Sequence, residues 1–276
     1  MTTFAPDLHW LAKLAASADQ APLRERVPLR WGAHTIGSVE PDFLRQIVWQ
    51  GADGAPALLQ VETLEGQPAW RVTGEASASL ARIAQVLRAA RAGRVVQHWR
   101  DEQLAVCNAQ GEQLATVERG VVRPLGIATR AVHLVGRSPD GRVWVQQRAL
   151  DKASEPGRWD TLMGGMVSAQ DTLALALARE TWEEAGLRLE AMAELRHGGQ
   201  LLLRKPSSDG ADAGYVVELV DWFQCTVPDG VQPLNQDGEV LQFELLALSE
   251  LARRLQRDEF TTEAALVLLA ALGDGP

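Results

Sequence analysis

The chain contains little cysteine, little tyrosine and no long run of apolar residues. Its two cysteines, Cys107 and Cys225, lie far apart, with no CxxC spacing and no histidine pattern around them. We therefore expect free thiols in a reducing compartment rather than a disulfide framework or a zinc site. No apolar stretch reaches the length that a bilayer-spanning helix needs. The first residues lack the basic start and apolar centre of a secretion signal, so we expect a cytoplasmic protein.

Basic residues are also in the minority. The sequence has 27 Lys and Arg against 36 Asp and Glu, a formal net charge of −9. Residues 1–122 hold 12 basic and 13 acidic residues, whereas the rest of the chain holds 15 and 23, so the excess of acid belongs to the second half. Binding to nucleic acid or to an acidic membrane needs a basic face. We expect neither as a partner, and the sequence leaves the oligomeric state open.

A length of 276 residues exceeds the usual size of one domain, so we expect two. Residues 1–122 predict a small α+β domain of unassigned role, with helices over 7–16, 42–49 and 75–92 and a hairpin turning at 108–111. Residues 123–276 predict helices around a mixed sheet, an α/β/α sandwich. The strands predicted there cover 127–135, 143–148, 201–204 and 215–226, with a last strand ending at 246 and a closing helix over 259–272.

One stretch, GMVSAQDTLALALARETWEEAGL from Gly165 to Leu187, carries the strongest pattern in the chain. Its part from Thr172 to Ala185 is rich in Leu and Ala and contains no Gly, Pro or Asn, which predicts a helix. Gly186 follows where a helix favours a left-handed C-terminal cap. The helix begins after either Ser168 or Thr172, because both can serve as the N-terminal cap.

Three carboxylates gather on one side of this helix. Glu180, Glu183 and Glu184 stand at i, i+3 and i+4, where like charges repel unless a cation lies among them. Carboxylate oxygens are hard donors of the kind that Mg²⁺ and Mn²⁺ bind together with water and substrate phosphate. A pair of glutamates on a helix is more often a solvated face. Here the flanking glycines and the Arg-Glu pair in register favour the functional interpretation.

The pattern resembles the signature of the Nudix hydrolases, which this chain meets with Gly165, Asp171, Arg179, Glu180, Glu183, Glu184 and Gly186. Asp171 stands where that family usually has Glu, and Thr181 where it usually has a bulky aliphatic residue. Further segments resemble the Nudix proteins related to the Nudix half of fungal thiamin pyrophosphokinase, and they cover nearly the whole chain: LRWGAHTIGSVEP, HWRDEQLAVCN, VERGVVRPLGIATRAVHLVG, RALDKASEPGRWDTLMGG and NQDGEVLQFELL.

This resemblance implies a Mg²⁺- or Mn²⁺-dependent hydrolase that cleaves the diphosphate of a small metabolite. The expected substrate is thiamin diphosphate, or its oxidised or damaged analogues, converted to the monophosphate. Two alternatives stay open: hydrolysis of an oxidised nucleoside diphosphate of the 8-oxo-dGDP type, and a non-catalytic binding module. Isomerase chemistry on a diphosphate is a third, for which the sequence shows no Cys and Glu pair near the signature.

The resemblance also implies residue roles. Glu180, Glu183 and Glu184 would hold metal together with the carbonyl of Gly165, and Arg179 would orient Glu180, which makes Glu180, Glu184 and Arg179 the expected catalytic residues. One more metal-binding carboxylate is expected from outside the signature. Its candidate is Glu239, with Glu244 in reserve, although Glu239 could equally be an exposed turn residue.

Three residues before the signature are candidates for binding the substrate. Arg148 and Lys152 could hold phosphate oxygens, although surface ion pairs would explain them as well. Trp159 could stack on a substrate ring or pack in the core. An apolar, aromatic pocket would prefer a neutral oxidised ring to the cationic thiazolium of thiamin, because burying an uncompensated cation is costly.

Overall fold

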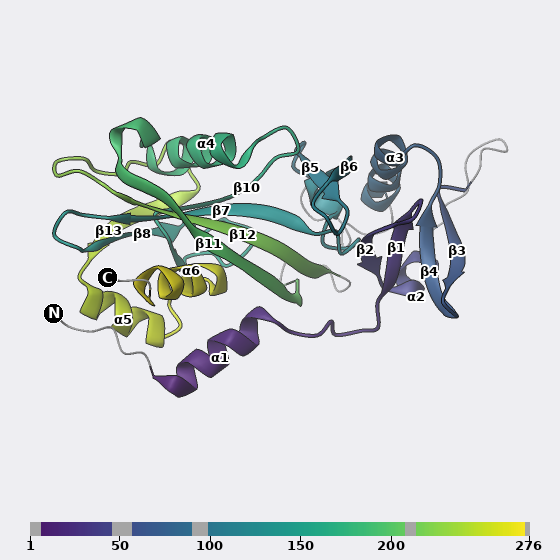
Figure 1. Cartoon of the computed structure of the whole chain (residues 1–276), viewed down its shortest axis with the longest axis horizontal. Coiled ribbons are helices and arrows are strands. Elements are labelled where there is room, and N and C mark those ends of the chain that lie inside the picture. The colour runs from purple at the N-terminus through teal and green to yellow at the C-terminus, as the bar shows by residue number, and fades with distance from the viewer. Residues whose placement is uncertain (1–6, 46–56, 90–98, 208–213, 274–276) are drawn as a thin grey trace.

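The computed structural model describes residues 7–45, 57–89, 99–207 and 214–273. Two sheets lie at opposite ends of the molecule, joined through a short hairpin (Figure 1). The larger sheet comes from the second half of the chain and the smaller one from the first half. No helix in the described ranges is long and apolar enough to cross a membrane.

The larger sheet is mixed. Its strand order is β11-β12-β7-β8-β13, with β10 paired to β7 and β9 paired to β8. Strands β7 and β12 run parallel and the other pairs antiparallel. The strands are β7 (Thr129–Arg137), β8 (Val143–Arg148), β9 (Trp159–Asp160), β10 (Met163–Met166), β11 (Ala193–Pro206), β12 (Tyr215–Thr226) and β13 (Val240–Leu246).

Helices cover both faces of this sheet (Figure 1). Helix α4 (Leu173–Ala185) packs on one face through a core that includes Leu134, Met163 and Leu177. The other face is covered by α1 (Leu8–Ala18), α5 (Leu248–Gln256) and α6 (Thr262–Gly273). The predicted α/β/α sandwich with a mixed sheet is therefore confirmed.

The first half of the chain forms the predicted small α+β unit. A four-stranded sheet in the order β2-β1-β4-β3 shares one core with a helix and with a separate two-stranded hairpin. Its elements are β1 (Val27–Trp31), β2 (His34–Val39), α2 (Pro41–Arg45), β3 (Leu59–Leu64), β4 (Gln67–Val72), α3 (Ala76–Ala89) and the hairpin β5 (Gln103–Cys107) and β6 (Gln113–Glu118). The predicted ends of the helices over 42–49 and 75–92 lie outside the described residues.

Several boundaries differ from the sequence prediction. Strand β11 is far longer than the predicted 201–204, because it pairs with β12 along most of its length. Helix α5 was not predicted. Helix α1, which the division at residue 122 assigned to the first domain, packs instead against α6 and β11. It does so because its apolar stripe, Trp10, Leu14 and Ala18, completes the core on that face.

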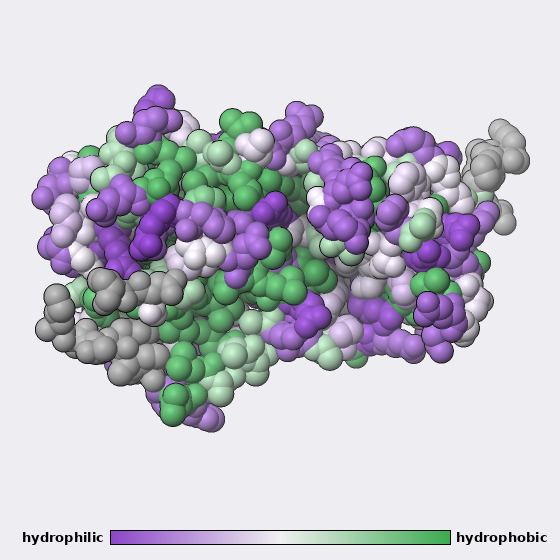
Figure 2. Space-filling model, in the orientation of Figure 1, coloured by the Kyte–Doolittle hydropathy of each residue, from purple (hydrophilic) through white to green (hydrophobic). Residues whose placement is uncertain are grey.

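Polar residues cover much of the visible surface of both units, and apolar residues gather over α1 and along β11 (Figure 2). The outward side of β11 is part of this pattern, since Leu202 is exposed while its neighbour Leu203 is fully buried. That alternation is what a strand with one face on the core requires.

The packing of α1 gives a direct test. Leu14→Ala should lower the free energy of unfolding by about 2–4 kcal/mol, because it empties a buried position in the core below the larger sheet. Leu8→Ala, on the same helix but 81% exposed, is the matched control and should change it by less than about 0.5 kcal/mol. Urea unfolding followed by fluorescence measures both, and equal effects would contradict this placement of α1.

Candidate active site

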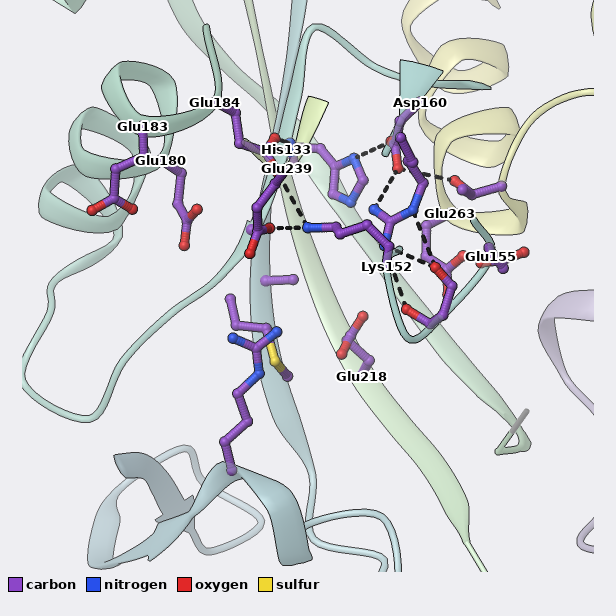
Figure 3. Close-up of a pocket in the computed structure, with 18 of the residues that line it drawn as sticks. His133, Lys152, Glu155, Asp160, Glu180, Glu183, Glu184, Glu218, Glu239 and Glu263 are labelled. Atoms are coloured by element: carbon purple, nitrogen blue, oxygen red, sulfur yellow. Dashed lines mark hydrogen bonds and ion pairs between the residues drawn. The ribbon is translucent and has the colours of Figure 1, made fainter. Parts of the chain in front are cut away.

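A pocket of about 470 Å³ opens beside helix α4. Glu180, Glu183 and Glu184 lie on its α4 side, and Glu218 and Glu263 lie across from them (Figure 3). Strands β7, β8, β10 and β12 and the loops after β8 and before β13 also contribute to its walls, as do Glu102 and Arg119, which flank the hairpin of the first unit. The signature helix therefore borders a pocket whose walls are mostly charged.

Helix α4 forms as the sequence predicts. Leu175 donates its N–H to the hydroxyl of Thr172 at 3.2 Å, which makes Thr172 the N-terminal cap, and Gly186 adopts the left-handed conformation at φ 63°. Leu177, Thr181 and Ala185 are buried against the sheet. With this face inward, the neighbouring stripe of glutamates is turned toward the pocket.

Arg179 neutralises part of the negative charge on this helix. Its guanidinium donates to Glu180 at 2.8 Å and to Glu183 at 3.1 Å. It also donates to Asp171 at 3.1 and 2.9 Å and to the carbonyl of Met166 at 3.2 Å. Asp171 is thus long enough to hold Arg179 in place, although the family usually has Glu there. The predicted orientation of Glu180 by Arg179 is consistent with these contacts.

Glu180 lies against the backbone of β10. A Cβ atom built on Gly165 would be 2.1 Å from the carboxyl carbon of Glu180, so no other residue fits at Gly165 while Glu180 keeps its position. Burial raises the pKa of Glu180 in spite of the opposing effect of Arg179. The spacing between the signature glycine and glutamate is therefore a steric requirement as well as a chemical one.

Glu184 is the most buried carboxylate of the helix, with its side chain 2% exposed. Its Oε2 accepts hydrogen bonds from the Gln146 side chain at 2.7 Å and from the N–H of Gly164 at 3.0 Å. Its Oε1 lies 4.0 Å from the ammonium of Lys152. Burial raises the pKa of Glu184 to about 7, even though Lys152 and both hydrogen bonds favour the charged form.

Lys152 and Glu239 meet on the wall of the pocket. The Lys152 ammonium forms an ion pair with Glu239 (Figure 3), and burial lowers the pKa of Lys152 against the opposing effect of Glu184. The structure therefore brings Glu239 beside the signature helix, with its side chain 46% exposed. Glu244, the reserve candidate, instead pairs with Arg254 at 2.6 Å and does not line the pocket.

Arg148 lines the pocket as expected. Its side chain is held by the carbonyl of Ser154 at 3.1 Å and by Asp160 at 3.4 Å, so part of its hydrogen-bonding capacity is already used. These contacts hold its charge on the wall of the pocket, which Lys152 also lines.

The expectation that Trp159 stacks on a substrate ring is wrong. Trp159 is 8% exposed, belongs to the core with Phe260, and carries the guanidinium of Arg254 over its ring at 4.8 Å. Successive residues of a strand face opposite ways, so Asp160 lines the pocket while Trp159 faces the core. If the strand were shifted by one residue, Trp159 would face the pocket and Asp160 would face the core.

Further charged and polar residues of the pocket were not predicted. Glu218 accepts from Arg123 at 3.0 Å and from Thr129 at 2.8 Å, Lys205 pairs with Glu263 at 3.0 Å, and His133 contacts Thr161 at 2.9 Å. These residues come from strands and loops far apart in sequence. No short motif connects them, and only the alternation along β7 and β12 could have indicated which of them face the pocket.

A divalent ion fits the donors beside α4 in type and number. No three His, Cys, Asp or Glu side chains in the described ranges converge closely enough to hold an ion as they stand. Mg²⁺ does not need such a cage, because it binds through one or two carboxylates together with water and substrate phosphate. Glu180 and Glu184 offer these carboxylates, and both have a pKa raised by burial that a nearby cation would relieve.

Gly165→Ala tests this arrangement. The added methyl group should displace Glu180 and weaken binding of Mn²⁺ by about tenfold or more, as expected when the support of a metal ligand is lost. Gly273→Ala is the control, because no atom lies within 4 Å of its added Cβ. Titration calorimetry with Mn²⁺ measures both variants. Wild-type affinity in Gly165→Ala would contradict the role given to this close approach.

Comparison with known proteins agrees with the geometry. Residues 128–267 match the model of the NUDIX domain, which is just over half of the chain. An uncharacterized Nudix hydrolase of Pseudomonas aeruginosa is 35% identical over 107 residues, 39% of this chain and 62% of that protein. An uncharacterized protein of Saccharomyces cerevisiae is 26% identical over 187 residues, 63% of this chain and 54% of that protein.

The chain thus spans a little over half the length of these two curated relatives. Among solved structures, a crystal structure of a Deinococcus radiodurans protein is similar with a TM-score of 0.49 and 20% identity, covering 61% of this chain and 99% of that one. The NUDIX match contains the signature helix, Glu239 and most of the pocket wall, and the chain belongs to the Nudix family.

Proposed function

We propose that this protein is a Mg²⁺- or Mn²⁺-dependent hydrolase that cleaves the diphosphate of a small metabolite. The observation that carries the proposal is the pairing of opposite charges in one pocket. Glu180 and Glu184 of the signature helix face it, and Lys152 and Arg148 line it beside them. Carboxylates can hold a metal ion, and cationic side chains can hold phosphate oxygens.

The reaction needs a water molecule, a phosphorus atom and a proton acceptor. The water oxygen forms a new bond to phosphorus, the bridging P–O bond breaks toward the leaving phosphate, and a carboxylate takes the proton of the water. We assign the last role to Glu184, because its Oε2 accepts hydrogen bonds from Gln146 and Gly164 while its Oε1 lies on the side of Lys152. A bound divalent ion would supply neutralisation of the phosphate charge.

Thiamin diphosphate, or its oxidised or damaged analogues, is the substrate class that we propose. A pocket of about 470 Å³ suits a small metabolite. No Phe, Tyr or Trp of the described chain lines it, and His133 is the one aromatic side chain among its lining residues. The scarcity of aromatic side chains affects the rings of thiamin and of a purine alike, so an oxidised nucleoside diphosphate stays the alternative substrate.

The wall of the pocket across from α4 is ionic rather than aromatic (Figure 3). Glu155, Glu218 and Glu263 lie there with Lys205 and Arg123, so a cationic ring would meet carboxylates and a carbonyl-bearing ring would meet donors. The expected preference for neutral analogues depended on an apolar, aromatic pocket. The pocket is not of that kind, so the preference is no longer expected. Both the cationic and the neutral forms of the thiamin ring remain within the proposed substrate class.

Isomerase chemistry that uses a cysteine is not favoured. Neither Cys107 nor Cys225 lines the pocket. Burial also raises the pKa of Cys225 to about 12, which keeps that thiol protonated.

Removing one carboxylate charge tests the catalytic proposal. Glu184→Gln should lower kcat by about a thousandfold, the scale of loss when a general base is removed, while the fold is retained. Glu244→Gln is the control, since Glu244 pairs with Arg254 outside the pocket. Phosphate release at a fixed Mg²⁺ concentration measures both. Near wild-type turnover in Glu184→Gln would remove this residue from the mechanism.

A substrate panel tests the substrate class. We expect thiamin diphosphate and its oxo and oxy analogues to be hydrolysed with kcat/KM about tenfold or more above that of 8-oxo-dGDP, equivalent to ~1.4 kcal/mol in transition-state binding. Steady-state phosphate release with Mg²⁺ provides the measurement. Activity confined to the nucleotide would favour the alternative substrate. Binding of these compounds without phosphate release from any of them would favour a binding module.

A further inference from the structure

The hairpin β5–β6 of the first unit reaches the Nudix signature directly. Leu104 forms an antiparallel bridge with Ser168, and Ala169 donates its N–H to the carbonyl of Gln103 at 2.8 Å. The hydroxyl of Ser168 donates to Glu102 at 2.7 Å. Ser168 and Ala169 belong to the segment between β10 and α4, so the first unit is hydrogen-bonded to the loop that leads into the glutamate helix.

This hairpin places Arg119 on the wall of the pocket. Arg119 follows β6 directly, and both Arg119 and Glu102 line the pocket together with Glu180 and Lys152. Arg119 is anchored on both sides. Its N–H donates to the carbonyl of Glu102 at 2.8 Å, and Val121, two residues later, is fully buried in the core of the first unit.

The guanidinium of Arg119 has N–H donors that form no hydrogen bond within the described part of the chain. Within the described part of the chain its side chain donates one hydrogen bond, to Glu102 at 2.7 Å, and 37% of the side chain is exposed. A guanidinium carries five N–H donors. The other arginines of this wall are more fully engaged, since Arg179 bonds four different partners and Arg148 is held by Ser154 and Asp160.

A diphosphate beside α4 requires such a group. The helix contributes three carboxylates, and the cations nearest to them, Arg179 and Lys152, are each paired with two or more carboxylates. A guanidinium with unused donors can bind phosphate oxygens in a bidentate manner without giving up its existing partner.

We propose that Arg119 binds phosphate oxygens of the substrate, so that the first unit of the chain completes the diphosphate site of the Nudix domain. This inference rests on the proposed function as far as the ligand is a diphosphate. Glu102 is then a positioning residue, because it holds Arg119 with one carboxylate oxygen and Ser168 with the other. The site thereby takes one cation from outside the residues that match the NUDIX model.

Imidodiphosphate, a diphosphate analogue with a P–N–P bridge, provides a test that does not depend on turnover. With Mg²⁺ present, Arg119→Ala should weaken its binding by about tenfold or more, the effect of losing a charge-assisted hydrogen bond. Arg119→Lys should recover part of the loss, since it keeps the charge but not the fork of donors. Calorimetry on the full chain gives the dissociation constants.

Arg71→Ala is the matched control. Arg71 is also an arginine of the first unit, is 47% exposed and pairs with a single glutamate, Glu62, but it does not line the pocket. Its variant should bind imidodiphosphate like the wild type. Thermal unfolding of both alanine variants without ligand shows whether Arg119 serves only to dock the hairpin. A lower Tm with unchanged affinity in Arg119→Ala would overturn the proposal.

Measurements of turnover distinguish a failure of this inference from a failure of the proposed function. On any diphosphate that the protein hydrolyses, Arg119→Ala should raise KM by about tenfold and change kcat little, as expected for a contact made equally in the ground and transition states. Unchanged KM overturns the inference and leaves the hydrolase proposal intact. If Arg119→Ala weakens imidodiphosphate binding but the protein hydrolyses no diphosphate, the inference holds and the hydrolase proposal is wrong. If the wild type does not bind imidodiphosphate with Mg²⁺, the inference is wrong.

Discussion

Mutual repulsion among the carboxylates of α4 is the constraint that the rest of the site has to meet. Glu180, Glu183 and Glu184 share one side of the helix, and such an arrangement costs free energy unless cations approach it. The structure supplies cations from two directions. Arg179 lies on the same helix and contacts Glu180 and Glu183, whereas Lys152 comes from the loop after β8 and approaches Glu184. The positions of Asp171 and Glu239 follow, because each is paired with one of these cations.

Helix packing then decides which carboxylate is buried. Thr181 and Ala185 belong to the face of α4 that lies on the sheet, and Glu184 is adjacent to that face, so it enters a nearly dry environment. A buried carboxylate needs hydrogen-bond donors. Gln146 and the backbone of Gly164 provide them from the sheet itself. The same rigid elements thus fix the helix, the carboxylate and its donors, which is the preorganisation that a reactive group requires.

Features that depend on residues close together in the sequence could be predicted. Features that depend on contacts between distant parts of the chain could not. The limits of α4, the role of Gly186 and the exposure of the glutamates toward one side depend on residues within a few turns of one another. The sequence could not decide whether Trp159 lines the pocket or packs in the core, because its orientation depends on the phase of a two-residue strand, which composition does not reveal. The contact of Glu218 with Thr129 depends on the parallel register of β12 and β7, set by residues almost 90 positions apart. Likewise, nothing near α1 in sequence indicates that it packs on α6.

Contacts at the boundary between the two units also link distant parts of the chain to the site. Met166, the last residue of β10, is buried in the core of the first unit, although it lies one residue after Gly165 of the signature. Its carbonyl accepts a hydrogen bond from Arg179. The segment that supports the glutamates is therefore held on one side by the larger sheet and on the other by the core of the first unit. Because packed cores transmit small displacements rather than absorbing them, a loosened first unit would move Met166 and, through Arg179, the carboxylates. A region without catalytic residues in its sequence pattern can thus control the geometry of the site.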